Sequence, residues 1–122
     1  MPKMSTILYV DDEKINLMLF EVNFRNKFNI ISAFSGKDGL NKLSQNTNID
    51  VVISDMKMPQ MNGVEFITKV KENRPNLPCF ILTGYDLTPE ISEAINLKIV
   101  DRYLAKPFNI NEIESAIISV LK

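Results

Sequence analysis

Short apolar runs alternate along the chain with longer segments in which apolar residues recur at helical spacing. The apolar runs predict five strands, over Thr6–Val10, Asn29–Phe34, Val51–Ile53, Cys79–Leu82 and about Asp101–Ala105. Continuous apolar runs are typical of strands that are buried on both faces of a parallel sheet. The strands are therefore expected to lie inside the protein, with helices covering them.

The segments that follow the strands predict helices with one apolar side. In the first helix, Ile15, Leu19 and Val22 recur at i, i+4 and i+7, and we expect this stripe to face the core. Asn96 is the candidate for a left-handed residue that ends the fourth helix. The second helix is expected to begin at Ser35-Gly36, with Leu40 and Leu43 on its apolar side, and the third at about Gly63, with Phe66, Ile67 and Val70. The fourth is expected to begin at Thr88-Pro89, with Ile91, Ala94 and Ile95 on its apolar side. The last is expected to begin at Asn109, with Ile110, Ile113, Ile117 and Val120.

Five alternations of strand and helix place the chain in the α/β class. Such alternation predicts a parallel sheet with helices on both faces, joined by right-handed crossovers. A chain of 122 residues is long enough for one domain with a core of its own. We expect residues 1–122 to form this single domain, with no effector domain attached.

The composition narrows the chemistry that the domain can perform. The chain has no histidine, which excludes Ser-His-Asp triads, acid–base catalysis by histidine and the common zinc sites. Its single cysteine, Cys79, lies in an apolar run and is expected to be a core residue in a reducing compartment. A net charge of −1, with no long apolar segment or signal peptide, gives no support for a nucleic-acid or membrane surface. Any chemistry must therefore use carboxylates, hydroxyls, lysine or a hard metal ion.

Polar residues suited to chemistry stand at the ends of four predicted strands. Asp11 and Asp12 follow the first strand, Asp55 the third, Thr83 the fourth and Lys106 the fifth. These side chains should converge, because the carboxyl ends of parallel strands share one edge, where open α/β folds bind ligands. Crowded carboxylates repel one another unless a cation lies among them, and Mg²⁺ prefers oxygen ligands. We therefore expect a magnesium site, with Asp12 in more direct contact than Asp11.

These five residues at the strand ends also suit the transfer of a phosphoryl group, which needs an in-line nucleophile and positive charge around the phosphoryl oxygens. Asp55 is the candidate nucleophile, since carboxylates can accept phosphoryl groups as acyl phosphates. Lys106 could pair with a phosphate oxygen, and the Thr83 hydroxyl could donate to another. Each residue alone has an ordinary alternative: Asp11 and Asp12 could cap the first helix, Asp55 or Thr83 could start a turn, and Lys106 could be solvated. The five residues together favour the phosphoryl site.

Over essentially its whole length, the chain resembles the CheY-like receiver domains of two-component response regulators. The resemblance rests on Asp11-Asp12, Asp55 with Met58-Pro59 and Gly63, Thr83-Gly84, and Tyr103 with Lys106-Pro107-Phe108. It implies a flavodoxin-like, doubly wound sheet with the strand order 2-1-3-4-5. It also implies a cis peptide bond between Lys106 and Pro107.

The resemblance further implies a phosphoacceptor that is not a conventional enzyme. Asp55 would take a phosphoryl group from the phosphohistidine of a sensor histidine kinase or a histidine phosphotransfer protein. Mg²⁺ would be held by Asp12, Asp55 and the backbone carbonyl of Lys57, with Asp11 acting through water. The implied location is cytoplasmic, without direct contact to nucleic acid or membrane.

Thr83 and Tyr103 would, by the same resemblance, form a switch that alters the surface of the fourth helix, fifth strand and fifth helix. A downstream effector domain or protein would respond to this surface, which could also form a homodimer. From its spacing alone, Tyr103 could equally be an ordinary aromatic residue at a sheet edge. Lys57 and Tyr85 lie two residues after Asp55 and Thr83, so the lifetime of the phosphoryl group stays open.

Two other functions use similar residues. Phosphatases of the haloacid dehalogenase type also have an aspartyl nucleophile, a threonine, a lysine and paired acids. They require an Asp-x-Asp motif after the first strand, whereas this chain has Asp55-x-Lys57 after the third. A phosphorylation-independent adaptor with a vestigial site is the other alternative, and the presence of all five strand-end residues argues against it.

Overall fold

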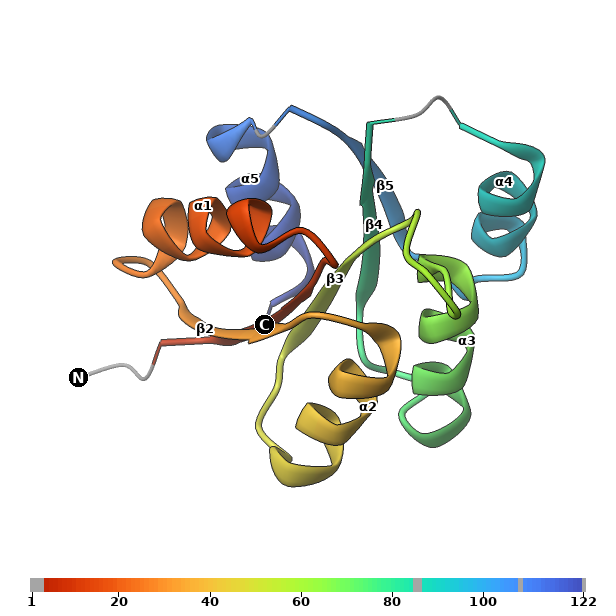
Figure 1. Ribbon diagram of the computed structural model, residues 1–122, viewed down its shortest axis with the longest axis horizontal. Coiled ribbons are helices and arrows are strands. Elements are labelled where there is room, and N and C mark those ends of the chain that lie inside the picture. The colour runs from red at the N-terminus through yellow and green to blue at the C-terminus, as the bar shows by residue number, and fades with distance from the viewer. Residues whose placement is uncertain (1–3, 85–86, 108, 122) are drawn as a thin grey trace.

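Five parallel strands form one sheet in the order β2-β1-β3-β4-β5, and a helix follows each strand (Figure 1). The computed structural model describes residues 4–84, 87–107 and 109–121. The elements are β1 (Thr6–Val10), α1 (Lys14–Phe24), β2 (Asn29–Ala33), α2 (Gly36–Gln45), β3 (Val51–Asp55), α3 (Gly63–Asn73), β4 (Cys79–Thr83), α4 (Pro89–Asn96), β5 (Arg102–Ala105) and α5 (Ile110–Val120). The predicted α/β class, the flavodoxin-like topology and the strand order are confirmed.

The strands contribute side chains to two apolar cores, one on each face of the sheet, because successive side chains of a strand point to opposite faces. Leu8 and Val10 of β1 belong to the core that also holds the buried residues of α2, α3 and α4. Ile7 and Tyr9 belong to the core of α1 and α5. Figure 1 shows α1 and α5 on one side of the sheet and the other three helices on the opposite side. Within the described residues, no helix is long and apolar enough to cross a membrane.

Helix α1 buries a different side from the one expected. Phe20 and Phe24 are fully buried, whereas Ile15, Leu19 and Val22 are 69%, 46% and 49% exposed. The prediction for this helix was wrong because apolar residues occur on more than one of its sides, so that spacing alone did not select a face. Burying the aromatic rings removes more apolar area from water than burying the smaller aliphatic side chains.

The apolar sides predicted for the other helices agree better with the structure. Ile110, the first residue of α5, is the exception and is 37% exposed. The residues that are buried in a core are Leu43, Phe66, Ile67, Val70, Ile91, Ala94, Ile113 and Ile117, and those that pack against a core while partly exposed are Leu40, Ile95 and Val120.

The strand bounds depart from the apolar runs at several ends. Strands β3 and β4 continue through Asp55 and Thr83, so both polar residues are part of the sheet. Strand β2 stops before Phe34, whose side chain is 66% exposed. Asp101 precedes β5. Its backbone N–H donates to the carbonyl of Cys79, and its carboxylate accepts a hydrogen bond from the backbone N–H of Cys79.

Side-chain hydrogen bonds cap the N-termini of four helices, at the starts that the sequence predicts. The cap residues Ser35, Asn62, Thr88 and Asn109 each accept a hydrogen bond from the backbone N–H three residues further on. The expected left-handed cap at Asn96 was wrong, since the residue with positive φ is Lys98, at 62°. The chain turns there because the N–H groups of Lys98 and Ile99 bond back to the last carbonyls of α4.

Candidate functional site

The pairing of β1 with β3 brings three acidic residues to one edge of the sheet. Val10 lies beside Ser54 in the register of these strands, so that Asp11 emerges next to Asp55. One carboxylate oxygen from each of Asp11, Asp12 and Asp55 lies within 4.8 Å of the others. Asp11 and Asp55 are buried and Asp12 is exposed. The cluster therefore concentrates negative charge at the rim of the sheet, where water has limited access to two of the three groups.

Lys106 places a positive charge among these acids. Its Nζ atom lies 3.2 Å from Oδ2 of Asp11 and 3.4 Å from Oδ1 of Asp55. Burial acts to lower the pKa of Lys106, but the two carboxylates outweigh this effect and raise it, so the side chain stays charged. The predicted convergence of lysine and acids is what the structure shows.

The carboxyl group of Asp55 has a pKa of about 6, well above its ordinary value of 3.8. Burial is the largest cause, and the charge of Asp11 adds to it, while Lys106 and the backbone N–H of Met56 lower the pKa. At neutral pH the group is still mostly ionised, but its charge is less well solvated than that of an exposed carboxylate.

The backbone around Asp55 is held by the start of α3. The N–H of Gly63 donates to the carbonyl of Met56 at 2.8 Å. A Cβ atom on Gly63 would overlap the carbonyl oxygen of Asp55 and would lie 2.7 Å from Cδ1 of Ile81. Gly63 is therefore required by close approach of two backbone segments and not by a left-handed φ.

The carboxyl end of β4 brings Thr83 to this edge, whereas Tyr103 lies within β5, away from the strand end. Thr83 is 1% exposed, and its carbonyl accepts a hydrogen bond of 2.8 Å from the N–H of Lys106. Tyr103 is partly buried and lies beside Ile81 in the ladder of β4 and β5. The peptide bond between Lys106 and Pro107 is cis, as the sequence led us to expect. Tyr85 and Phe108 lie outside the described residues.

Tyr9 is a part of the site that the sequence interpretation missed. Its hydroxyl donates to Oδ2 of Asp11 at 2.7 Å, and both residues are fully buried. Burial, followed by the charge of Asp11, raises the pKa of Tyr9, so the hydroxyl keeps its proton. The available signal was a tyrosine inside an apolar strand, two residues before Asp11 and hence on the same strand face.

An open pocket of about 790 Å³ lies over the acids. Seven of its lining residues were singled out from the sequence, and the other two are Glu13 and Asn16. The seven are Asp12, Asp55, Lys57, Met58, Pro59, Gly84 and Lys106. Glu13 and Asn16 come from the start of α1 and were not predicted. A pocket lined by carboxylates and two lysines suits a hard cation together with an anion such as a phosphoryl group.

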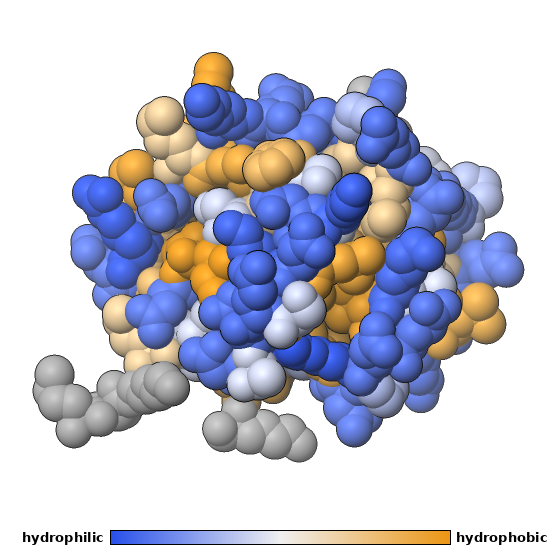
Figure 2. All heavy atoms as spheres, turned by 60° about the horizontal axis from the view of Figure 1, so that its bottom comes forward, coloured by the Kyte–Doolittle hydropathy of each residue, from blue (hydrophilic) through white to orange (hydrophobic). Residues whose placement is uncertain are grey.

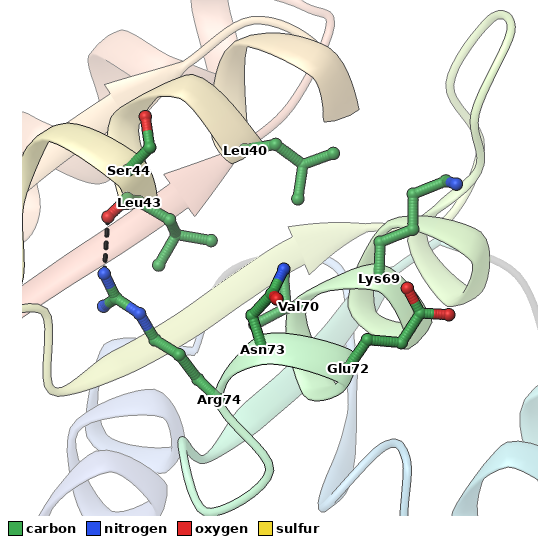
Figure 3. A pocket seen from close by; sticks show the side chains of 8 residues that line it. All are labelled: Leu40, Leu43, Ser44, Lys69, Val70, Glu72, Asn73 and Arg74. Carbon is green, nitrogen blue, oxygen red and sulfur yellow. Dashed lines mark hydrogen bonds between the residues drawn. The ribbon is translucent and has the colours of Figure 1, made fainter.

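A second groove, of about 400 Å³, lies between α2 and α3 and contains none of the strand-end residues. Its floor is formed by Leu40, Leu43 and Val70, and the guanidinium of Arg74 closes one end by donating to the carbonyl of Leu43 (Figure 3). On the face that carries these helices, apolar surface lies in hollows between hydrophilic side chains (Figure 2). Arg74 also donates to the carbonyl of Asn46 at 3.2 Å, so it fastens α3 to the end of α2.

Known proteins share the sequence pattern of this chain. The protein family described as the response regulator receiver domain matches this chain over residues 7–118. The chain is 33% identical to sporulation initiation phosphotransferase F of Bacillus subtilis over 112 residues, which cover 91% of the chain and 89% of that protein. It is also 28% identical to the uncharacterised transcriptional regulatory protein YcbL of Bacillus subtilis over 117 residues, or 95% of the chain. The chain spans only 50% of the length of YcbL.

Solved structures share the fold. The response regulator protein TrrA of Thermotoga maritima, in complex with Mg²⁺-BeF, matches with a TM-score of 0.84 and 27% identity, covering 97% of this chain and 100% of that one. The acidic pocket formed by Asp11, Asp12 and Asp55 is consistent with a phosphoacceptor in two-component signalling. On sequence pattern, topology and site geometry together, the chain belongs to the response regulator receiver domain family.

Proposed function

We propose that the chain is the phosphoacceptor of a two-component phosphorelay, and that Asp55 receives the phosphoryl group. The observation that carries this proposal is the contact of a single ammonium group, that of Lys106, with both Asp11 and Asp55 beside an open acidic pocket. Positive charge is thus held next to the candidate nucleophile, where the charge of a phosphoryl group would need stabilising. As a receiver domain, the chain is not a conventional enzyme.

The proposed step makes one bond and breaks one. A carboxylate oxygen of Asp55 attacks the phosphorus of a phosphohistidine, in line with the P–N bond. The electron pair of that bond leaves with the imidazole, which takes up a proton, and an acyl phosphate forms on Asp55. Oδ1 of Asp55 already accepts from the N–H of Met56 and contacts Lys106, whereas no described residue donates a hydrogen bond to Oδ2. Oδ2 is therefore the favoured attacking oxygen.

The donor set of the pocket fits Mg²⁺, because it offers carboxylate oxygens close together and its lining contains no cysteine or histidine. In our proposal Asp12 and Asp55 would hold the ion directly, the backbone carbonyl of Lys57 would add a third oxygen, and Asp11 would act through water. When bound, the ion would supply positive charge to the oxygens of the phosphoryl group. The TrrA structure, which is in complex with Mg²⁺-BeF, supports the proposal that this chain also binds Mg²⁺.

Thr83 and Tyr103 are proposed to carry the signal from the pocket to the surface. Thr83 is buried at the end of β4, directly before the pocket residue Gly84, so a small rotation would turn its hydroxyl to an acyl phosphate. The space that it leaves would admit the ring of Tyr103 from the neighbouring strand. This would change the surface of α4, β5 and α5, to which an effector domain, an effector protein or a second copy could respond.

The donor of the phosphoryl group is proposed to be a sensor histidine kinase or a histidine phosphotransfer protein. The exposed side of α1 supports such a partner, because it presents Ile15, Met18, Leu19 and Val22 to solvent. The start of the same helix lines the pocket through Asn16. A protein that packs on this apolar surface would thus be adjacent to Asp55.

Incubation with acetyl phosphate and Mg²⁺, followed by intact-protein mass spectrometry, tests the proposed function. We expect one phosphoryl group on the wild type and none on Asp55→Asn. Asp50→Asn is the matched control, because Asp50 lies at the opposite end of β3 and its carboxylate accepts from the N–H of Thr6. It should be phosphorylated like the wild type. Wild-type protein that stays unmodified would indicate an adaptor with a vestigial site, and continued release of phosphate from small phosphomonoesters would indicate a phosphatase.

A further inference from the structure

The hydroxyl of Tyr9 reaches the acidic pocket from inside the sheet. Side chains two residues apart on a strand point to the same face, so the ring of Tyr9 lies under the carboxylate of Asp11. The O–H···O distance is 2.7 Å, and neither residue is exposed to solvent. A hydrogen bond to a buried carboxylate is stronger than one between neutral groups, and it fixes the orientation of the acceptor.

The oxygen that Tyr9 contacts is also the one that holds Lys106. Oδ2 of Asp11 lies 3.2 Å from Nζ of Lys106, while Oδ1 accepts from the N–H of Glu13 at 2.9 Å. The acceptor capacity of Oδ2 is therefore shared between a hydroxyl and an ammonium group. Without the hydroxyl, Asp11 would draw the ammonium more strongly to itself and away from Asp55.

The position of the hydroxyl is set by α1 and not by the pocket. The ring of Tyr9 stacks on that of Phe20, with centroids 4.1 Å apart and planes 9° from parallel. Phe20 is fully buried and packs in turn against Phe24, at 4.6 Å between centroids. Stacked and enclosed in this way, the ring of Tyr9 has little freedom to move its hydroxyl.

We propose that Tyr9 is a positioning residue of the phosphoacceptor site. Its hydroxyl fixes the carboxylate of Asp11 and thereby keeps Lys106 shared between Asp11 and Asp55. The inference rests on the proposed function, in which the ammonium of Lys106 must be available to a phosphoryl group on Asp55.

The test compares phosphorylation rates at saturating Mg²⁺ and acetyl phosphate. Tyr9→Phe keeps the stacked ring and removes the hydroxyl, and we expect the rate to fall by about tenfold, the effect of one strong hydrogen bond. In a Lys106→Ala background, the same substitution should have little further effect, because the hydroxyl acts through the lysine. Phe28→Leu is the matched control: it should lower the unfolding midpoint and leave the rate of the folded protein unchanged. Phe28 is buried in the same core, and the described contact of its ring is with Phe24, at 6.4 Å between centroids, outside the pair formed by Tyr9 and Phe20.

Each outcome decides between the two proposals. An unchanged rate in Tyr9→Phe, or an equal slowing with and without Lys106, overturns the positioning role alone. Absence of phosphorylation in the wild type overturns the proposed function and this inference with it. If Tyr9→Phe does not fold, Phe20→Leu takes its place, because it keeps the hydroxyl but removes the ring on which Tyr9 stacks. A rate for Phe20→Leu equal to that of Phe28→Leu would then refute the positioning role.

Discussion

The ammonium nitrogen of Lys106 lies 3.4 Å from Oδ1 of Asp55, although β4 separates their two strands in the sheet. The contact is possible because both residues stand at carboxyl ends of parallel strands, and the lysine side chain reaches across the end of β4. Its charge lowers the pKa of Asp55, but burial and the nearby Asp11 still leave that pKa at about 6. One lysine therefore does not fully compensate the acids gathered here.

Replacing Asp55 with asparagine should stabilise the metal-free protein at neutral pH. The expected gain in the free energy of unfolding is on the order of 1 kcal/mol, because an incompletely compensated buried charge is removed. The pKa of Asp55 is about 6 in the folded protein and 3.8 in the reference state, so the folded protein binds more protons between these values. Stability of the wild type thus falls as pH rises through this window, and the advantage of Asp55→Asn should vanish near the lower value.

Urea unfolding with a chelator present, repeated across this pH range, measures the effect. Asp50→Asn serves as the control, since the carboxylate of Asp50 accepts a hydrogen bond at 2.8 Å from the N–H of Thr6 and is not crowded by the other acids. It should not stabilise the protein. An unfolding midpoint of Asp55→Asn at or below that of the wild type at neutral pH would contradict acid crowding.

Mg²⁺ should stabilise the wild type in a concentration-dependent way, and Asp12→Ala should lose most of this response. Asp12 is the exposed member of the acidic cluster, so its removal costs little packing. We expect Mg²⁺ affinity to fall by at least about tenfold, and the metal-free variant to be more stable than the wild type by on the order of 1 kcal/mol. Thermal melts with increasing MgCl₂ provide the measurement. Glu72→Ala, which removes an exposed acid at the α2–α3 groove, should respond to Mg²⁺ like the wild type.

Gly63→Ala should destabilise the protein and disturb the site at the same time. The added methyl group would overlap the carbonyl oxygen of Asp55 and lie 3.0 Å from Cα of Met56, which are backbone atoms that cannot move independently. The expected loss is on the order of 2 to 3 kcal/mol in the free energy of unfolding. Gly84→Ala is the control, because among the described residues its added methyl group would meet only Cβ of Lys106, at 4.0 Å. Chemical denaturation that gave equal stabilities for the two variants would rule out this close approach as the reason for Gly63.

Thr83→Ala should separate phosphorylation from the switch. The variant keeps Asp55 and Lys106, so we expect it to bind beryllofluoride with Mg²⁺. Amide NMR signals around Tyr103 should move less than in the wild type, because the hydroxyl that would turn to the acyl phosphate is missing. Thr68→Ala offers a matched control, since the Thr68 hydroxyl bonds to the carbonyl of Val64 within α3. Equal signal shifts in Thr83→Ala and the wild type would speak against Thr83 as the link.

Much of this protein could be read from local sequence. The alternation of strands and helices follows from apolar periodicity, and the helix starts at Ser35, Thr88 and Asn109 follow from cap chemistry. The acids and Lys106 could be placed at one edge of the sheet because parallel strands share the direction of their carboxyl ends. Each of these properties depends on residue type and order alone.

The buried face of α1 and the role of Tyr9 were decided only by the tertiary structure. Apolar residues occur on more than one side of α1, and the side that it buries depends on the contact of Phe20 with Tyr9, a residue of another element. The hydrogen bond from Tyr9 to Asp11, and the sharing of Lys106 between Asp11 and Asp55, depend on distances between side chains of separate strands. Periodicity carries no information about such distances, because they are set by how the strands and helices pack against one another.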